Sequence, residues 1–264
     1  MTELKRPKAF TTLRGTFKTA SSQTPVTEVM KSEGTPVDLE KDPQAVSALA
    51  LDWLPFAAKT YNISPHIEDY VIVTTPICPS GLPNRNGIGF PLSELTRYMP
   101  PPVGRQAYKA WAGTPMHLEH DNEDHTKAYG VVLDSMLTQI KGYGGGKYWK
   151  VMGLAAIDKN KYPDIAQEIL DGTIDTYSMG ALSDVLTCSV CGATAYGPKK
   201  KYQNCRHISS TDEVNFHVVN YNGRALLAYL NAHLLSPIEL SIVRDPAWVV
   251  ANSDMILTPS ESFE

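Results

Sequence analysis

Between residues 70 and 250 the sequence is divided into short segments of high β-strand propensity, separated by turn-forming residues. The run at 70–75 is rich in β-branched residues and predicts a strand that stops at Pro76. A tight hairpin is indicated by Asn222-Gly223. Further strands are predicted at 116–119, 128–137, 148–157, 216–220, 224–229 and 238–243. This spacing predicts a mostly β, barrel-like domain with a few helices (α+β).

Helices are predicted at two main places. Residues 43–61 carry apolar side chains at helical spacing, with Pro55 expected to kink or interrupt the helix. Residues 162–170 predict a short helix with Pro163 in its first turn and Gly172 as its stop. The chain is therefore divided into an N-terminal arm at 1–66, partly flexible and containing the first helix, a domain at 67–252, and a C-terminal tail at 253–264.

Charge and hydropathy argue against two classes of partner. The net charge of -4 gives no electrostatic footprint for nucleic acid and no attraction to anionic membranes. No apolar run approaches the roughly 18–20 residues that span a bilayer. The N-terminus also lacks the apolar region of a secretory signal. We therefore expect no membrane partner and no nucleic-acid partner.

Three of the four cysteines lie within one short stretch, which favours a metal site in a reducing compartment over a disulfide framework. Cys188, Cys191, Cys205 and His207 form a C-x2-C and C-x-H pattern. Three thiolates and one imidazole match the tetrahedral preference of zinc. The sequence predicts a structural zinc knuckle inserted at 186–210. Cys78 stands alone and is expected to be a small buried apolar residue.

Two polar segments carry side chains suited to catalysis. His120 lies in a dense run of titratable groups at 116–125, and a histidine of near-neutral pKa can take a proton from a hydroxyl. Ser178 lies at 175–180, just beyond the second predicted helix and its glycine stop, and Gly180 allows close backbone approach to a substrate carbonyl. A solvated loop and an ordinary turn explain these segments equally well, so the residues alone leave both as candidates.

Three motifs in this order resemble the prohead maturation proteases of tailed bacteriophages. They are Thr-Pro-Met-His-Leu-Glu-His-Asp-Asn at 114–122, Gly-Val-Val-Leu-Asp at 130–134 and Tyr-Ser-Met-Gly at 177–180. The segment at 238–247 is similar to the closing strand of that family, and the resemblance covers roughly residues 70–250. It implies a herpesvirus-protease-like β-barrel, here with a small inserted zinc knuckle.

The resemblance also implies roles for individual residues. Ser178 is the implied nucleophile, His120 the general base, and Glu239 the acidic third member that orients the imidazole. Asp158 and Asp134 are alternatives for the third member. The implied activity is endopeptidase cleavage of scaffold or core proteins and of the major capsid protein, with self-processing and a preference for glutamate before the cleaved bond. The implied location is the assembling prohead in the host bacterial cytoplasm.

Two other functions remain open. A metal-dependent hydrolase could be built on the cluster of His117, His120, Asp121, Asp124 and His125. Within that cluster, the odd spacing of His117 and His120 predicts that they face opposite sides of a strand. A non-enzymatic phage assembly module could instead dock onto scaffold or nucleic acid through the zinc knuckle and the basic loop at 199–201.

Overall fold

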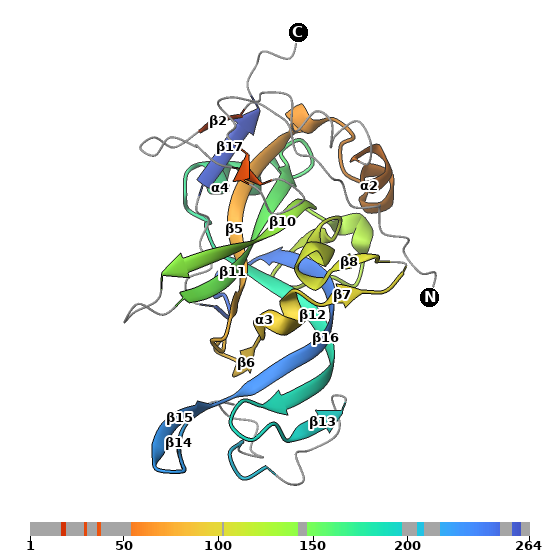
Figure 1. Ribbon diagram of the computed structural model, residues 1–264. Coiled ribbons are helices and arrows are strands. Elements are labelled where there is room, and N and C mark those ends of the chain that lie inside the picture. Colours follow the sequence, from red (N-terminus) through yellow and green to blue (C-terminus); the bar gives the residue numbers. More distant parts are fainter. Residues whose placement is uncertain are drawn as a thin grey trace.

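The computed structural model describes residues 54–101, 103–141, 147–196, 205–208 and 217–248, together with the backbone of short strands at 17–19, 29–30, 36–37 and 255–259. Its main element is a ten-stranded sheet that curls into a half-barrel (Figure 1). The strand order is β13-β12-β16-β9-β10-β11-β5-β17-β2, and β6 pairs with β16. The prediction of a mostly β chain with few helices is confirmed.

The elements have the following bounds. The large sheet contains β2 (Phe17–Thr19), β5 (Tyr70–Ser80), β6 (Ile88–Gly89), β9 (Pro115–Leu118), β10 (Gly130–Lys141), β11 (Lys147–Asp158), β12 (Tyr177–Cys188), β13 (Thr194–Tyr196), β16 (Leu230–Ile242) and β17 (Met255–Pro259). Two-stranded pairs are β3 (Val29–Met30) with β4 (Pro36–Val37), β7 (Tyr98–Met99) with β8 (Arg105–Gln106), and β14 (His217–Tyr221) with β15 (Arg224–Ala228). The helices are α2 (Leu54–Tyr61), α3 (Leu92–Leu95) and α4 (Pro163–Leu170), with 3-10 turns η1 (Ile67–Asp69), η2 (Ala107–Trp111) and η3 (His125–Lys127). Among these helices, none is both long enough and apolar enough to cross a membrane.

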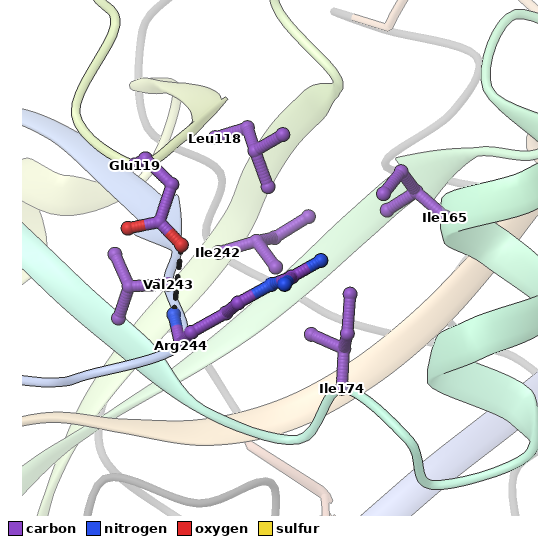
Figure 2. Close-up of a pocket in the computed structure, with 7 residues that line it drawn as sticks. All are labelled: Leu118, Glu119, Ile165, Ile174, Ile242, Val243 and Arg244. Atoms are coloured by element: carbon purple, nitrogen blue, oxygen red, sulfur yellow. Dashed lines mark hydrogen bonds between the residues drawn. The ribbon is translucent and has the colours of Figure 1, made fainter.

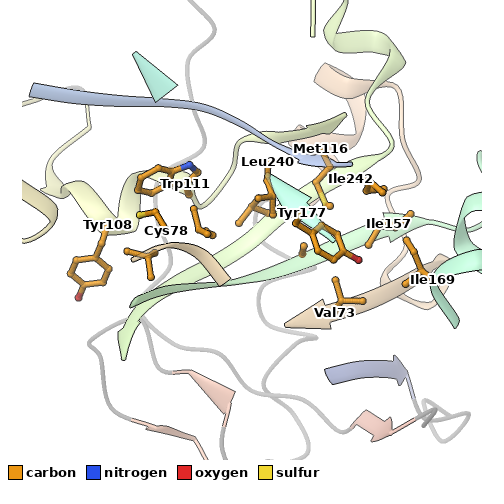
Figure 3. Close-up of a cluster of buried hydrophobic side chains, with 14 of the residues drawn as sticks. Val73, Cys78, Tyr108, Trp111, Met116, Ile157, Ile169, Tyr177, Leu240 and Ile242 are labelled. Atoms are coloured by element: carbon orange, nitrogen blue, oxygen red, sulfur yellow. The ribbon is translucent and has the colours of Figure 1, made fainter. Parts of the chain in front are cut away.

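The long strands β5, β10 and β11 are apolar on both faces because both faces are covered. On one face, side chains such as Ile72 and Leu154 pack with Leu54 and other residues of α2. On the opposite face, alternate residues of the same strands pack with α4 and η2 around Trp111 and Tyr177 (Figure 3). Burial on both faces explains why 70–75 is a continuous apolar run without alternation. Cys78 lies in this second cluster with 1% exposure, as expected for a small apolar residue.

Several element boundaries differ from the sequence expectation. Pro55 is the second residue of α2 as described, a position where the missing N–H of proline leaves no helix hydrogen bond unmade. The part of the predicted helix at 43–53 lies outside the described residues. β5 continues through Pro76 to Ser80, and its pairing with β11 shifts register at this point. α2 precedes the predicted boundary at 66/67 and packs in the core. β17 follows the predicted boundary at 252/253 and pairs with β5 of the large sheet.

β16 brings the functional segments together. It pairs antiparallel with β12, so that Ser178 lies opposite Ser241, and parallel with β9, so that His117 also lies opposite Ser241. The pairing of β16 with β12 shifts register between Pro237 and Glu239. Pro237 has no amide N–H and so cannot donate a hydrogen bond to the neighbouring strand. The segments that carry His120, Ser178 and Glu239 therefore meet on three adjacent strands.

Candidate active site and metal-binding cluster

His120 follows the end of β9 in a sharp reversal of the chain. Glu119 and His120 both have left-handed backbone conformations, with φ of 50° and 62°. Such φ values are rare for residues other than glycine and cost roughly 1–2 kcal/mol each, so the surrounding structure must hold them. The backbone N–H of Arg244 donates to the Glu119 carboxylate at 2.9 Å, and the Glu119 N–H donates to the Ile242 carbonyl at 2.9 Å. These contacts fix the reversal that returns the imidazole to the sheet.

Glu239 holds the imidazole of His120. Its side chain is fully buried, and its Oε1 atom lies 2.6 Å from Nδ1 of His120. The second oxygen, Oε2, accepts a hydrogen bond of 2.9 Å from the hydroxyl of Ser241. Because an ionised carboxylate only accepts hydrogen bonds, Nδ1 carries the proton. In the neutral ring Nε2 is then left with its lone pair, the form that a general base requires.

The pair shifts the pKa of both partners. The hydrogen bond to Glu239 raises the pKa of His120 above its ordinary 6.5; partial burial opposes this, and the nearby negative charges of Glu239 and Glu119 add to it. Burial alone would raise the pKa of Glu239. Hydrogen bonds from His120 and Ser241 outweigh that effect and hold the pKa below 4.5. The carboxylate is therefore ionised at neutral pH and stabilises the imidazolium.

Ser178 lies on strand β12 and not in the turn that the motif resemblance implies. In the pairing of β12 with β16, Ser178 lies opposite Ser241, and Gly180 lies opposite Glu239. A Cβ atom on Gly180 would stand 2.7 Å from Cγ and 2.9 Å from Oε1 of Glu239. The glycine therefore leaves room for the Glu239 carboxylate. Across the described part of the chain, no hydrogen bond joins the hydroxyl of Ser178, which is 8% exposed, to His120.

The alternative acids have other partners. The carboxylate of Asp134 lies 3.2 Å from Nζ of Lys109 and accepts the backbone N–H of Ser135. Asp158 accepts three backbone N–H groups, including that of Ser64 at 2.7 Å. Of the three carboxylates considered for the third position, Glu239 is the one in contact with His120.

His117 is buried beside this site with 1% exposure. Neither ring nitrogen has a hydrogen-bond partner within the described residues. Its ring centroid lies 6.1 Å from that of His125. The strand alternation predicted to separate His117 from His120 does not apply, because β9 ends at Leu118 and His120 lies beyond it. In the region that the structure describes, the histidine and aspartate run at 117–125 forms no group of three converging metal ligands.

Cys188, Cys191, Cys205 and His207 converge on one point. Their ligand atoms all lie within 4.8 Å of one another, so they could hold a metal ion. The Sγ atoms of Cys191 and Cys205 are 3.5 Å apart, far beyond a disulfide bond, and Nδ1 of His207 lies 3.8–3.9 Å from the Sγ atoms of Cys205 and Cys188. With bonds of about 2.3 Å to sulfur and 2.0 Å to nitrogen, the ligands of a tetrahedral zinc ion stand roughly 3.6–3.8 Å apart. The three spacings given above are close to these values, and the remaining pairs lie within 4.8 Å.

The cluster connects the elements of the extension shown at the bottom of Figure 1. Cys188 ends β12, and the backbone N–H of Val190 donates to its Sγ atom at 3.4 Å. His207 packs edge-on against Tyr221 of the β14–β15 hairpin, with ring centroids 5.4 Å apart. Cys188 and Cys205 also belong to a small apolar cluster with Leu230, at the start of β16. A bound metal would therefore join two segments of the chain, 188–191 and 205–207, in a part of the protein that has little other core.

A pocket opens beside the His120 reversal. It has a volume of about 340 Å³, and its walls are mainly apolar. Figure 2 shows the Arg244 side chain lying along the pocket, with its guanidinium directed toward Ile165 and Ile174. No ion-pair partner of this guanidinium occurs in the part of the chain that the structure covers. The pocket is lined by Leu118, Glu119, Ile165, Ile174, Ile242, Val243 and Arg244.

Sequence reasoning missed two residues of this site. Ser241 could have been found from strand alternation, because it is two positions after Glu239 and so points to the same face. Arg244 gave no such signal, since it follows the strand and its position depends on the contact between its backbone and Glu119. Comparisons of the chain with protein-family models, curated proteins and solved structures return no match.

Proposed function

We propose that the protein is a serine endopeptidase, with Ser178 as nucleophile and His120 as general base. Glu239 orients the imidazole of His120 and stabilises its protonated form. The observation that supports this most directly is the 2.6 Å contact between Nδ1 of His120 and the buried Glu239 carboxylate. This contact leaves Nε2 of the neutral ring without a proton. On β12, Ser178 lies opposite Ser241, which is two residues after Glu239 on β16. The motif resemblance extends the proposal to scaffold, core and capsid proteins as substrates, cleaved inside an assembling phage prohead.

The mechanism requires one proton to move twice. Nε2 of His120 takes the proton of the Ser178 hydroxyl while Oγ attacks the scissile carbonyl carbon. The imidazolium, stabilised by Glu239, gives this proton to the leaving amine as the peptide bond breaks. Water then attacks the acyl ester in the same way and regenerates Ser178. Because Ser178 and His120 are not hydrogen-bonded in this structure, substrate binding has to bring the two side chains into contact.

The Arg244 pocket is a suitable site for the side chain before the cleaved bond. The methylene groups of a glutamate side chain fit its apolar walls, and its carboxylate can pair with the guanidinium of Arg244. This chemistry agrees with the glutamate preference that the resemblance implies. For the cysteine cluster we propose zinc in a structural role, because all four ligands are protein groups and none is left for a substrate.

A reagent that reacts only with activated serines tests the proposal. Diisopropyl fluorophosphate should add one phosphoryl group to the full-length protein, and peptide mapping should place it on Ser178. His120→Ala should slow this labelling by about 10²-fold or more, because the general base is lost. Ser80 is a matched internal control, since it is equally buried on another strand of the same sheet. Labelling spread over several serines, or its complete absence, would contradict the proposed nucleophile.

The pH dependence of cleavage gives a second prediction. Only neutral His120 can accept the serine proton, so kcat/KM should rise with pH, with a midpoint above 6.5 because the pKa of His120 is raised. Glu239→Gln removes the negative charge that raises this pKa, so the midpoint should move down. The plateau rate should fall by about 10²–10⁴-fold. The measurement is kcat/KM on a peptide substrate between about pH 5 and pH 9. An unchanged midpoint in Glu239→Gln would exclude this acid as the partner of the base.

A further inference from the structure

Glu119 belongs both to the reversal that carries His120 and to the Arg244 pocket. Its backbone takes the first of the two left-handed conformations that turn His120 back toward the sheet. Its carboxylate accepts the backbone N–H of Arg244 at 2.9 Å, and its side chain lines the same pocket as the Arg244 side chain (Figure 2). Glu119 therefore connects the wall of the pocket with the backbone of the proposed general base.

Two long-range hydrogen bonds tie this reversal to the end of β16. The Glu119 N–H donates to the Ile242 carbonyl, and the Glu119 carboxylate accepts from Arg244, which lies 125 positions later in the chain. Two consecutive left-handed residues, neither of them a glycine, persist only where neighbouring structure holds them. A displacement of Arg244 would therefore be passed on to the backbone of His120.

We propose that Glu119 is a positioning residue that couples occupation of the Arg244 pocket to the placement of His120. This inference rests on the proposed protease function. A substrate glutamate that pairs with the guanidinium fixes Arg244, and with it the backbone N–H that holds the Glu119 carboxylate. The reversal is thereby stabilised in the conformation from which Nε2 reaches the serine. Because no hydrogen bond joins Ser178 and His120 in the described part of the chain, the binding energy has a rearrangement to drive.

This coupling predicts which kinetic constant expresses the preference for glutamate. Binding energy that only holds the substrate lowers KM, whereas binding energy used to align the reacting groups raises kcat. A peptide with glutamate before the cleaved bond should therefore have a higher kcat than the same peptide with alanine at that position. Because Glu119 joins the pocket to the general base, this advantage in kcat should depend on Glu119.

The test uses two peptides that span a cut mapped in unfolded casein, with glutamate or alanine before the cleaved bond, and variants of the full-length chain. Glu119→Gly removes the carboxylate, and glycine adopts the left-handed conformation without strain, so the chain should still fold. It should lower kcat for the glutamate peptide by about 10–100-fold and abolish its advantage over the alanine peptide, with little change in KM. Glu119→Gln retains an oxygen that accepts the Arg244 N–H and should keep the advantage. Glu123→Gly is the matched control, because it removes an exposed glutamate from the same loop and should cleave both peptides like the wild type.

Rates are compared on the high-pH plateau, because the pKa of His120, raised mainly by the hydrogen bond to Glu239, is raised further by the charge of Glu119. Glu119→Asn also tolerates the left-handed conformation, and its side chain is one methylene shorter, so it replaces Glu119→Gly if that variant does not fold. A glutamate preference confined to KM, equal cleavage of both peptides by the wild type, or an advantage in kcat that survives loss of the Glu119 carboxylate would overturn the coupling alone. Failure of diisopropyl fluorophosphate to label Ser178 in the wild type would instead overturn the protease function.

Discussion

Ser178→Ala is expected to abolish cleavage of scaffold substrates and of the chain itself, lowering kcat/KM by about 10⁶-fold, because no other oxygen can form the acyl intermediate. His120→Ala should lose nearly as much, and the double variant should be no worse than either single one, since the two residues act as a unit. The measurement is intact mass over time, with a scaffold protein present. The fragment masses should place most cuts after glutamate.

Two controls make this result decisive. Ser80→Ala removes a hydroxyl of similar burial from a strand outside the site, 6% exposed against 8% for Ser178, and should cleave normally. Circular dichroism should show that Ser178→Ala remains folded, because losing one hydroxyl leaves no cavity of consequence. A folded Ser178→Ala that cleaves like the wild type would remove the nucleophile assignment. The non-enzymatic assembly module would then become the better hypothesis.

Loss of the proposed zinc ion is the second change for which we expect a large effect. Structural zinc sites contribute about 10–16 kcal/mol of apparent binding free energy, which is also folding free energy. Cys205→Ser or removal of zinc by a chelator should therefore unfold the extension that contains β13, β14 and β15. Hydrogen exchange should become fast there and stay slow in β5, β10 and β11, which have their own core.

The zinc content of the wild type and of two cysteine variants tests this prediction. The wild type should contain one zinc ion per chain, and Cys205→Ser should contain far less. Cys78→Ala alters a buried cysteine outside the cluster and should retain the zinc. Purified wild type without bound metal and with normal protection in the extension would contradict the structural role. A catalytic metal would behave differently, because a chelator would then stop cleavage while the extension stayed folded.

The sequence predicted the structure best where a group of residues had a single physical explanation. The three cysteines and His207 could be grouped from spacing alone, and their side chains do converge. The β-branched runs located β5, β10 and β11 because propensity and burial agree in those strands. The packing of α2 and the pairing of β17 with β5 were not predictable, since they depend on which face and which edge of the sheet the rest of the chain leaves uncovered.

Strand β12 shows why the rest could not be predicted. Its first half, around Gly180, has little strand propensity, so pairing with β16 decides its conformation. The glycine that suggested a turn instead makes room for the Glu239 carboxylate. The left-handed conformation of His120 was equally hidden, because it is held by contacts with residues more than a hundred positions later in the chain.

The long-range contact between His120 and Glu239 also affects when activity can first arise. The two residues are 119 positions apart, and the strand that carries Glu239, β16, lies between β9 and β12 in the sheet. During translation His120 and Ser178 leave the ribosome well before β16 does, and non-local strand pairing forms slowly. A nascent chain therefore holds Ser178 and His120 without the carboxylate that orients the imidazole. For the protease function proposed above, this order of synthesis would postpone cleavage until β16 has joined the sheet.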